Sequence, residues 1–185
     1  MSWHKNFLAF DTETSGFSSN DHVLELAALH FVDGQVVETF YERFLPIGID
    51  WDAESTKQAQ AVNHITQEQL DGYPPFGHHV DQLLALLDKS DILVGHNAQF
   101  DARMLKQEFA RVGRVWAPKI LLCTYEFEKR LSPHPRKLAD ACPRWGVKLS
   151  NAHSAFFDAQ ATGELVLAMQ RSGRIAPFML PPAIR

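Results

Sequence analysis

The run Phe7-Leu8-Ala9-Phe10 restricts the fold most strongly, because it is apolar at every position and stops abruptly at Asp11. A strand that faces solvent on one side alternates apolar and polar residues, whereas a strand covered on both faces is apolar throughout. Four residues alone would also fit a short piece of helix. The run therefore favours, without proving, a strand in a sheet that is buried on both faces.

The segments that follow alternate between strand patterns and helix patterns. Residues 23–31 and 35–44 are strand-like and flank Asp33-Gly34, a dipeptide favoured in tight hairpin turns. Residues 80–87 carry apolar side chains at helical spacing, and residues 92–94 are typical of a short buried strand. We expect an antiparallel hairpin followed by alternating helices and strands.

The second half of the chain continues this alternation. A helix is predicted from Asn97 or Ala98, where Asn would act as the N-cap, to a stop at Gly113. The other predicted elements are a strand over residues 119–123, short helices over 125–131 and 136–141 with Pro133, Pro135 and Pro143 as breakers, and a final helix over about 154–170. This order of elements predicts a mixed α/β domain.

Length and composition indicate one soluble domain. The chain has 185 residues, 45% apolar and 22% charged, which excludes collagen-like and disordered classes. No apolar run approaches the roughly 18 to 20 residues of a membrane span, and no signal peptide is expected. Cys123 and Cys142 suggest neither a disulfide framework nor a zinc site. We expect a cytoplasmic protein with no membrane partner, a domain over residues 1–172 and a short tail over 173–185.

Charge is divided unevenly along the chain. Residues 1–100 carry 4 Lys and Arg against 15 Asp and Glu, whereas residues 101–185 carry 14 against 7. Such blocks are often only solvated faces. They would also fit an acidic pocket for a cation beside a basic surface for a phosphate backbone. The sequence leaves both interpretations open.

Five residues in three segments have the chemistry of a metal site. Asp11 and Glu13 end the first predicted strand on the same face, where two carboxylates repel one another unless a cation lies between them. Asp101 falls in the first turn of a helix, which also suits an anion without any ligand. His153 precedes Asp158 by five residues, so a loop that leads into a helix can bring the two side chains together.

These residues lie in motifs that resemble a known family. The motifs are Asp11-Thr12-Glu13-Thr14-Ser15-Gly16, His96-Asn97-Ala98-Gln99-Phe100-Asp101 and His153-Ser154-Ala155-Phe156-Phe157-Asp158-Ala159. They resemble the DEDDh 3'-5' exonucleases, in particular the DnaQ-like type of the proofreading epsilon subunit of bacterial DNA polymerase III. The resemblance extends to about Met169 and implies an RNase H-like fold, with a mixed five-stranded sheet flanked by helices.

The resemblance also implies roles for the site residues. Asp11, Glu13, Asp101 and Asp158 would bind two Mg²⁺ or Mn²⁺ ions, and His153 would be the general base. Oxygen ligands suit Mg²⁺, two metals can activate water and stabilise a leaving 3' oxygen, and an imidazole can accept a proton near neutral pH. The expected reaction releases nucleoside 5'-monophosphates from the 3' end of single-stranded or frayed DNA.

Substrate contacts are predicted around the first and second motifs. Phe17 could stack on a base or be an ordinary core side chain. Many relatives have Val-His-Gly-Ile where this chain has Val62-Asn63-His64-Ile65, so base and sugar preference stay open. Phe156-Phe157 is bulkier than usual, for which core packing is the favoured explanation. The predicted substrate-binding residues are Thr14, Gly16, Phe17, Asn63, His64 and Phe100.

Three other functions fit parts of the sequence. One is an exoribonuclease like those that trim tRNA or degrade oligoribonucleotides. Another is a proofreading or interaction subunit whose partner is a polymerase or repair protein, and a third is a metal-dependent phosphatase. Residues 82–87 loosely resemble a sliding-clamp peptide, although their helical spacing favours core packing.

Overall fold

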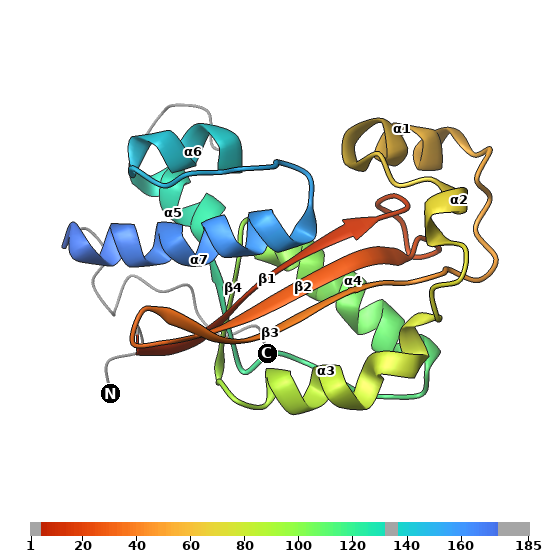
Figure 1. The fold of residues 1–185 in the computed structure, drawn as a ribbon, viewed down its shortest axis with the longest axis horizontal. Coiled ribbons are helices and arrows are strands. Elements are labelled where there is room, and N and C mark those ends of the chain that lie inside the picture. Colours follow the sequence, from red (N-terminus) through yellow and green to blue (C-terminus); the bar gives the residue numbers. More distant parts are fainter. Residues whose placement is uncertain (1–4, 132–136, 174–185) are drawn as a thin grey trace.

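A computed structural model describes residues 5–131 and 137–173 and contains one five-stranded sheet (Figure 1). The sheet has the order β3-β2-β1-β4-β5, in which β2 is antiparallel to β1 and β3, while β1, β4 and β5 run parallel. The predicted mixed sheet is confirmed. Its strands are β1 (Asn6–Thr14), β2 (Val23–Val32), β3 (Gln35–Arg43), β4 (Ile92–Gly95) and β5 (Ile120–Cys123).

The expected hairpin joins β2 and β3. Its two turn residues, Asp33 and Gly34, have φ angles of 49° and 83°. Positive φ at both central residues is the geometry of the hairpin turn whose twist matches that of its strands. The dipeptide Asp33-Gly34 therefore predicted this hairpin turn correctly.

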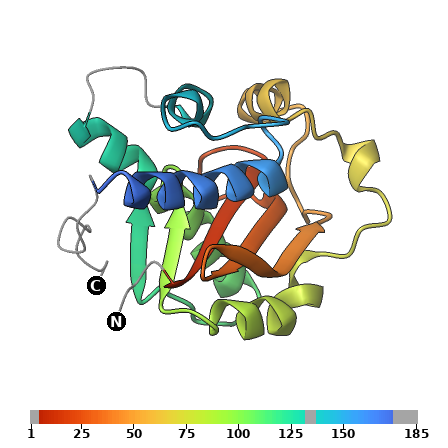
Figure 2. The ribbon, with the colours of Figure 1, turned by 60° about the vertical axis from the view of Figure 1, so that its left-hand side comes forward.

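Helices cover both faces of the sheet, as the continuous apolar run in β1 predicts. Leu8 and Phe10 pack in one core with α3 (Val80–Leu87) and α4 (Ala98–Arg111), whereas Phe7 and Ala9 pack in another with α7 (Ala155–Arg171). Figure 2 shows α7 on one side of the strands and α3 on the other. Because α3 buries Leu83, Leu86 and Leu87, the apolar face of residues 82–87 packs in the core, as their spacing favoured.

Outside this sandwich, the predicted helix over 125–131 is confirmed, whereas the other helices match the sequence less well. Pro143, predicted as a breaker, lies inside α6, where it removes a backbone donor only near the helix end. Pro133, Pro135 and the predicted helix start at residue 136 lie outside the described residues, as does most of the tail over 173–185. The sequence missed α1 and α2. The helices outside the sandwich are α1 (Glu54–Asn63), α2 (Gln67–Leu70), the 3-10 helix η2 (Phe76–His79), α5 (Thr124–Leu131) and α6 (Leu138–Arg144).

None of the helices in residues 5–131 and 137–173 combines the length and apolar character that crossing a membrane requires.

Gly163 allows α7 to approach the sheet closely. A Cβ atom built there would lie 2.4 Å from two ring atoms of Phe31, whose ring is stacked on Phe7 at 4.9 Å. We expect Gly163→Ala to lower the free energy of unfolding by about 1 to 3 kcal/mol, because the stacked ring cannot yield easily. Urea unfolding measures the change, with Glu164→Ala on the same helix as the control. A stabilised Gly163→Ala protein would contradict this packing.

Candidate active site

Asp11 and Glu13 stand at the carboxyl end of β1, on the face that packs against α7. Both side chains are half-buried, and they lie two residues apart on one strand, as the sequence predicts. Thr12, between them, points to the opposite face. The two acids therefore lie at the end of the central strand of the sheet.

Asp101 reaches this strand end from the first turn of α4. Its side chain is buried, and its Oδ1 accepts hydrogen bonds from the backbone N of Thr12 at 3.0 Å and from Thr12 Oγ1 at 2.7 Å. The sequence reasoning missed Thr12, which fixes Asp101 against β1. It also misjudged Asn97, which is at the N-cap position but has a left-handed backbone, φ 79°, and makes no side-chain cap bond.

His153 and Asp158 come from the beginning of α7. The His153 backbone has a φ of 64°, and its N–H donates to Asp158 Oδ2 at 3.2 Å. Ligand atoms of Glu13, His153 and Asp158 lie within 4.8 Å of one another. The other carboxylate oxygen, Asp158 Oδ1, is buried and has no hydrogen-bond partner among the described residues. A buried oxygen without a donor, beside two further ligand groups, fits a cation.

The pKa values of Asp11, Glu13 and Asp101 also agree with a cation at this place. Burial raises the pKa of Asp11 well above its usual range, and the charges of Asp101 and Asp158 raise it further. Burial also raises the pKa of Glu13, again with help from Asp158. For Asp101, burial raises the pKa although the hydrogen bonds from Thr12 oppose the effect. Without a cation, these groups disfavour simultaneous ionisation.

A cavity of about 480 Å³ adjoins the acids. Its lining includes Asp11, His153 and Asp158, together with Tyr125 and Lys137. Its volume is within the range of small-molecule sites in proteins. The cavity therefore offers nucleotide-sized space, and one cationic side chain, directly beside the acids.

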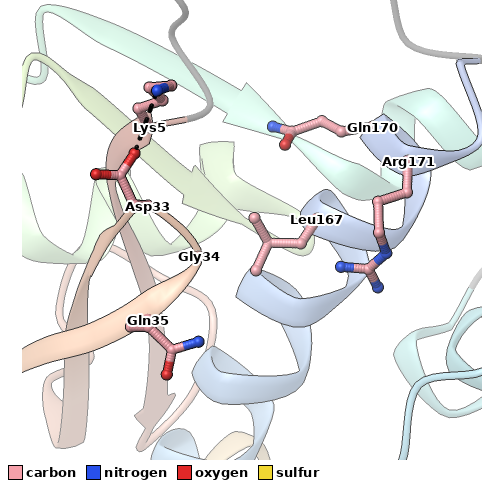
Figure 3. A pocket seen from close by; sticks show the side chains of 7 residues that line it. All are labelled: Lys5, Asp33, Gly34, Gln35, Leu167, Gln170 and Arg171. Atoms are coloured by element: carbon pink, nitrogen blue, oxygen red, sulfur yellow. Dashed lines mark ion pairs between the residues drawn. The ribbon is translucent and has the colours of Figure 1, made fainter.

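A second cavity, of about 410 Å³, lies away from these residues (Figure 3). It is formed between the β2-β3 turn and the end of α7, and an ion pair joins Lys5 to Asp33 at 3.6 Å there. None of the predicted site residues lines it. Its lining residues are Lys5, Asp33, Gly34, Gln35, Leu167, Gln170 and Arg171.

Phe17 is exposed on the surface and is not a core side chain. It is 64% exposed, and its ring centroid lies 5.7 Å from that of Phe100. The guanidinium of Arg103 lies over the other ring, 5.3 Å from the Phe100 centroid. Exposure excludes the core alternative for Phe17, and stacking on a base stays a prediction. Phe17 and Phe100 thus present a small aromatic surface, with a cation beside it, in the loop that follows Glu13 and on the first turn of α4.

Thr14 and Gly16 belong to the loop that carries Phe17. Thr14 Oγ1 donates to the Gly16 carbonyl at 2.8 Å, and a Cβ at Gly16 would lie 2.5 Å from Asp21 Oδ1. The Asp21 carboxylate accepts hydrogen bonds from Ser15 Oγ and from both the backbone N and Oγ of Ser18. These contacts give Gly16 a structural reason for lacking a side chain. The sequence reasoning did not identify Asp21, which organises this loop.

Asn63 and His64, both predicted to contact substrate, have different surroundings. Asn63 is buried, donates from Nδ2 to the Thr14 carbonyl at 3.0 Å and accepts the Ile65 N–H at 3.0 Å. His64 is exposed and has a left-handed backbone at the end of α1. Asn63 therefore ties α1 to the end of β1, whereas the side chain of His64 lies on the surface.

Comparison with known proteins gives a consistent result. A family model described as Exonuclease matches residues 8–166. The DNA polymerase III PolC-type of Halalkalibacterium halodurans is 31% identical over 166 residues, which is 88% of this chain but 11% of that protein. The chain thus spans a small part of such relatives.

Solved structures show the same fold. The complex of E. coli exonuclease I with single-stranded DNA, in its zinc-bound form, aligns with a TM-score of 0.75 and 21% identity, over 91% of this chain and 41% of that one. The nuclease domain of 3'hExo, described as a DEDDh family member and bound to rAMP, aligns with a TM-score of 0.75 and 12% identity, over 99% of both chains. At these identities the likeness establishes the RNase H-like fold.

Proposed function

This chain belongs to the exonuclease family, and we propose that it is a metal-dependent 3'-5' exonuclease that acts on single-stranded or frayed DNA ends. The observation that carries the proposal is the cluster of Glu13, His153 and Asp158, with Asp11 and Asp101 close enough to interact electrostatically. Asp158 Oδ1 is buried there and lacks a donor among the described residues. A phosphatase would need the same acids. It would not need the exposed ring of Phe17 in the loop that follows Glu13.

We propose that Asp11, Glu13, Asp101 and Asp158 hold two divalent ions, Mg²⁺ or Mn²⁺. Mg²⁺ and Mn²⁺ both bind readily to carboxylate oxygens. Bound there, the ions would supply Lewis-acid activation of water and neutralise charge on the phosphate. A ring nitrogen of His153 lies within 4.8 Å of carboxylate oxygens of Glu13 and Asp158, so the ring is close enough to act on a water molecule bound between them.

In the proposed reaction, the oxygen of water attacks the phosphorus atom and the bond from phosphorus to the 3' oxygen breaks. His153 takes the proton of the water, and the departing 3' oxygen is protonated from solvent. The backbone hydrogen bond from His153 to Asp158 holds the base next to the acids. The product leaves as a nucleoside 5'-monophosphate.

DNA is proposed over RNA because a relative that exceeds 30% identity is named as a DNA polymerase, and exonuclease I was solved with single-stranded DNA. The rAMP bound to 3'hExo supports the RNA alternative. By the same reasoning we propose a polymerase, or a repair protein, as a partner of this chain.

Phe17→Ala should weaken binding of a single-stranded end. Stacking of a base on an exposed aromatic ring contributes about 1 to 3 kcal/mol, so KM should rise about 5- to 150-fold while kcat changes little. Steady-state kinetics on a short oligonucleotide measure both constants. Tyr73→Ala, which removes an exposed aromatic side chain from another loop, is the control. Equal KM values for both variants would contradict a substrate role for Phe17.

The proposed function is tested by a time course on oligonucleotides labelled at the 5' end. Single-stranded, 3'-recessed and fully paired substrates are compared as DNA and as RNA, with Mg²⁺, Mn²⁺ or EDTA. A metal-dependent ladder that shortens from the 3' end is expected, faster on single-stranded DNA. A faster ladder on RNA would favour the exoribonuclease alternative. A folded protein that produces no ladder on any substrate would favour an interaction subunit.

A further inference from the structure

Glu25 is a buried carboxylate for which the proposed chemistry has no use. On β2 it lies directly across from Glu13, and on its other side it lies across from Arg43 of β3. Directly opposed residues share a face of the sheet, so these three charged side chains form a row across three strands. Only 1% of the Glu25 surface is exposed. A carboxylate this deep must be paired and hydrogen-bonded, and its partners show what it holds.

The two oxygens of Glu25 join β3 to the beginning of α7. Oε2 accepts from Arg43 Nε at 2.7 Å, and Oε1 accepts from the Ala155 backbone N at 2.9 Å and from Ser154 Oγ at 3.4 Å. Ala155 is the first residue of α7, so its N–H has no partner within the helix. Ser154 is at the N-cap position, yet its side chain makes no cap bond. Glu25 supplies the missing acceptor from a strand 130 residues away.

The segment held in this way carries two of the proposed site residues. His153 immediately precedes Ser154, and Asp158 lies in the first turn that Glu25 caps. A second contact supports the same turn, because the ring of Tyr41 on β3 meets Phe156 edge to face at 5.7 Å. The bulky Phe156 therefore packs against β3, which agrees with the packing explanation expected from the sequence.

We propose that Glu25, held by Arg43, is a positioning residue that fixes the first turn of α7 so that His153 and Asp158 face Glu13. This inference rests on the proposed function, since it assigns a purpose to the geometry of that site. A pair needed only for stability could be replaced by apolar side chains of similar volume. A pair needed for positioning cannot, because an apolar side chain accepts no hydrogen bond from Ala155.

The test compares three variants with a matched control. Glu25→Ala removes the acceptor, Glu25→Gln keeps an amide oxygen in its place, and the double variant Glu25→Leu/Arg43→Met fills the space with apolar atoms. The control is Glu108→Ala, because Glu108 is also buried, accepts a backbone N–H, that of Val23 at 3.1 Å, and pairs with an arginine, Arg111 at 2.6 Å. Calorimetry measures Mn²⁺ binding, thermal unfolding measures stability, and steady-state kinetics give kcat and KM.

Removing the acceptor is expected to weaken Mn²⁺ binding and to lower kcat, each by about 10- to 100-fold, with KM changed by less than about threefold. The double variant should show the same loss but be more stable than Glu25→Ala, because it leaves no unpaired Arg43 charge, and this separates positioning from stability. Glu25→Gln should recover most of the Mn²⁺ affinity. Glu108→Ala should lose stability and keep its Mn²⁺ affinity.

Two results would overturn the positioning role. One is a double variant with unchanged Mn²⁺ affinity and kcat, and the other is a Glu108→Ala protein whose Mn²⁺ affinity falls as far as that of Glu25→Ala. Either result, obtained while the unmodified protein binds Mn²⁺ and cleaves DNA, leaves the proposed function intact. An unmodified protein that neither binds Mn²⁺ nor cleaves overturns the proposed function and this role together.

Discussion

Asp11→Asn should abolish turnover and, in EDTA, should raise the thermal stability of the protein. Asp11 is surrounded by Asp101, Asp158 and Glu13, whose charges together with burial raise its pKa well above the usual range. An amide cannot replace the carboxylate as a metal ligand of equal charge, so the several kcal/mol that a metal contributes to the transition state should be lost. At about 1.4 kcal/mol for each factor of ten, kcat should fall about 1000-fold or more.

The second half of this prediction separates a metal site from a fold defect. Asn replaces a carboxyl group whose ionisation is disfavoured by burial and by the neighbouring acids, so the metal-free variant should unfold at a higher temperature than the metal-free unmodified protein. Asp91→Asn, at an exposed ion pair with Lys119, is the control and should change neither property. A folded Asp11→Asn protein with near-normal activity would show that Asp11 does not hold an essential metal.

Elements with strong local signals were predictable from the sequence. The run Phe7 to Phe10 is apolar at each position because α4 and α7 cover both sides of β1, and Asp33-Gly34 accepts the two positive φ angles that the hairpin needs. By contrast α1 buries only Thr56, Ala59 and Asn63, so it has no apolar stripe to find. Its position follows from contacts such as that of Asn63 with the Thr14 carbonyl, which no local pattern reveals.

The acids and the imidazole were predictable as a set, but the residues that hold them were not. Thr12 and Asp101 are 89 residues apart, and Glu25 and Ala155 are 130 residues apart, so neither contact has a local signature. One weak signal was present, since Glu25 is the one Asp, Glu, Lys or Arg in a mostly apolar strand. A charged residue inside a buried strand indicates a partner elsewhere, although the strand alone cannot say which.

The division of charge along the sequence proved to be a poor guide to the site. Asp101 and Asp158 belong to the half of the chain with excess Lys and Arg, yet they join Asp11 and Glu13 from the acidic half. Several of the basic residues are engaged by acids, as Arg111 is by Glu108. Folding therefore mixes the two halves, and the acidic pocket is assembled from both.

The metal-free protein should lose stability as the pH rises from about 5 to 8. Burial, followed by the charge of Asp158, raises the pKa of Glu13 to about 8, and burial raises the pKa of Asp101 to about 7 and that of Asp158 to about 6. The same carboxyl groups lose their protons near pH 4 in the unfolded chain. Across this interval the folded state holds more protons than the unfolded state, so the free energy of unfolding decreases with pH.

His30 acts in the opposite direction, because burial lowers its pKa. Its contribution to stability increases as the pH rises through the usual range of histidine and is complete above about pH 7. The interval from pH 7 to 8 therefore reports the acids alone. A shift of one pKa unit corresponds to about 1.4 kcal/mol, and the three carboxyl groups act in the same direction, so the total decrease from pH 5 to 8 should be several times that value.

Mn²⁺ should reverse this loss, because metal binding requires ionised carboxylates and displaces their protons. Urea unfolding at pH 5, 7 and 8, in EDTA and in Mn²⁺, measures the effect, and calorimetry in two buffers of different ionisation enthalpy counts the protons released. In EDTA, Asp11→Asn should show a smaller decrease, whereas Asp91→Asn should match the unmodified protein. If stability in EDTA rises from pH 7 to 8, the carboxyl groups are already ionised at pH 7 in the folded, metal-free protein. Their pKa values are then not raised by one another, and the repulsion that a cation is proposed to relieve is absent.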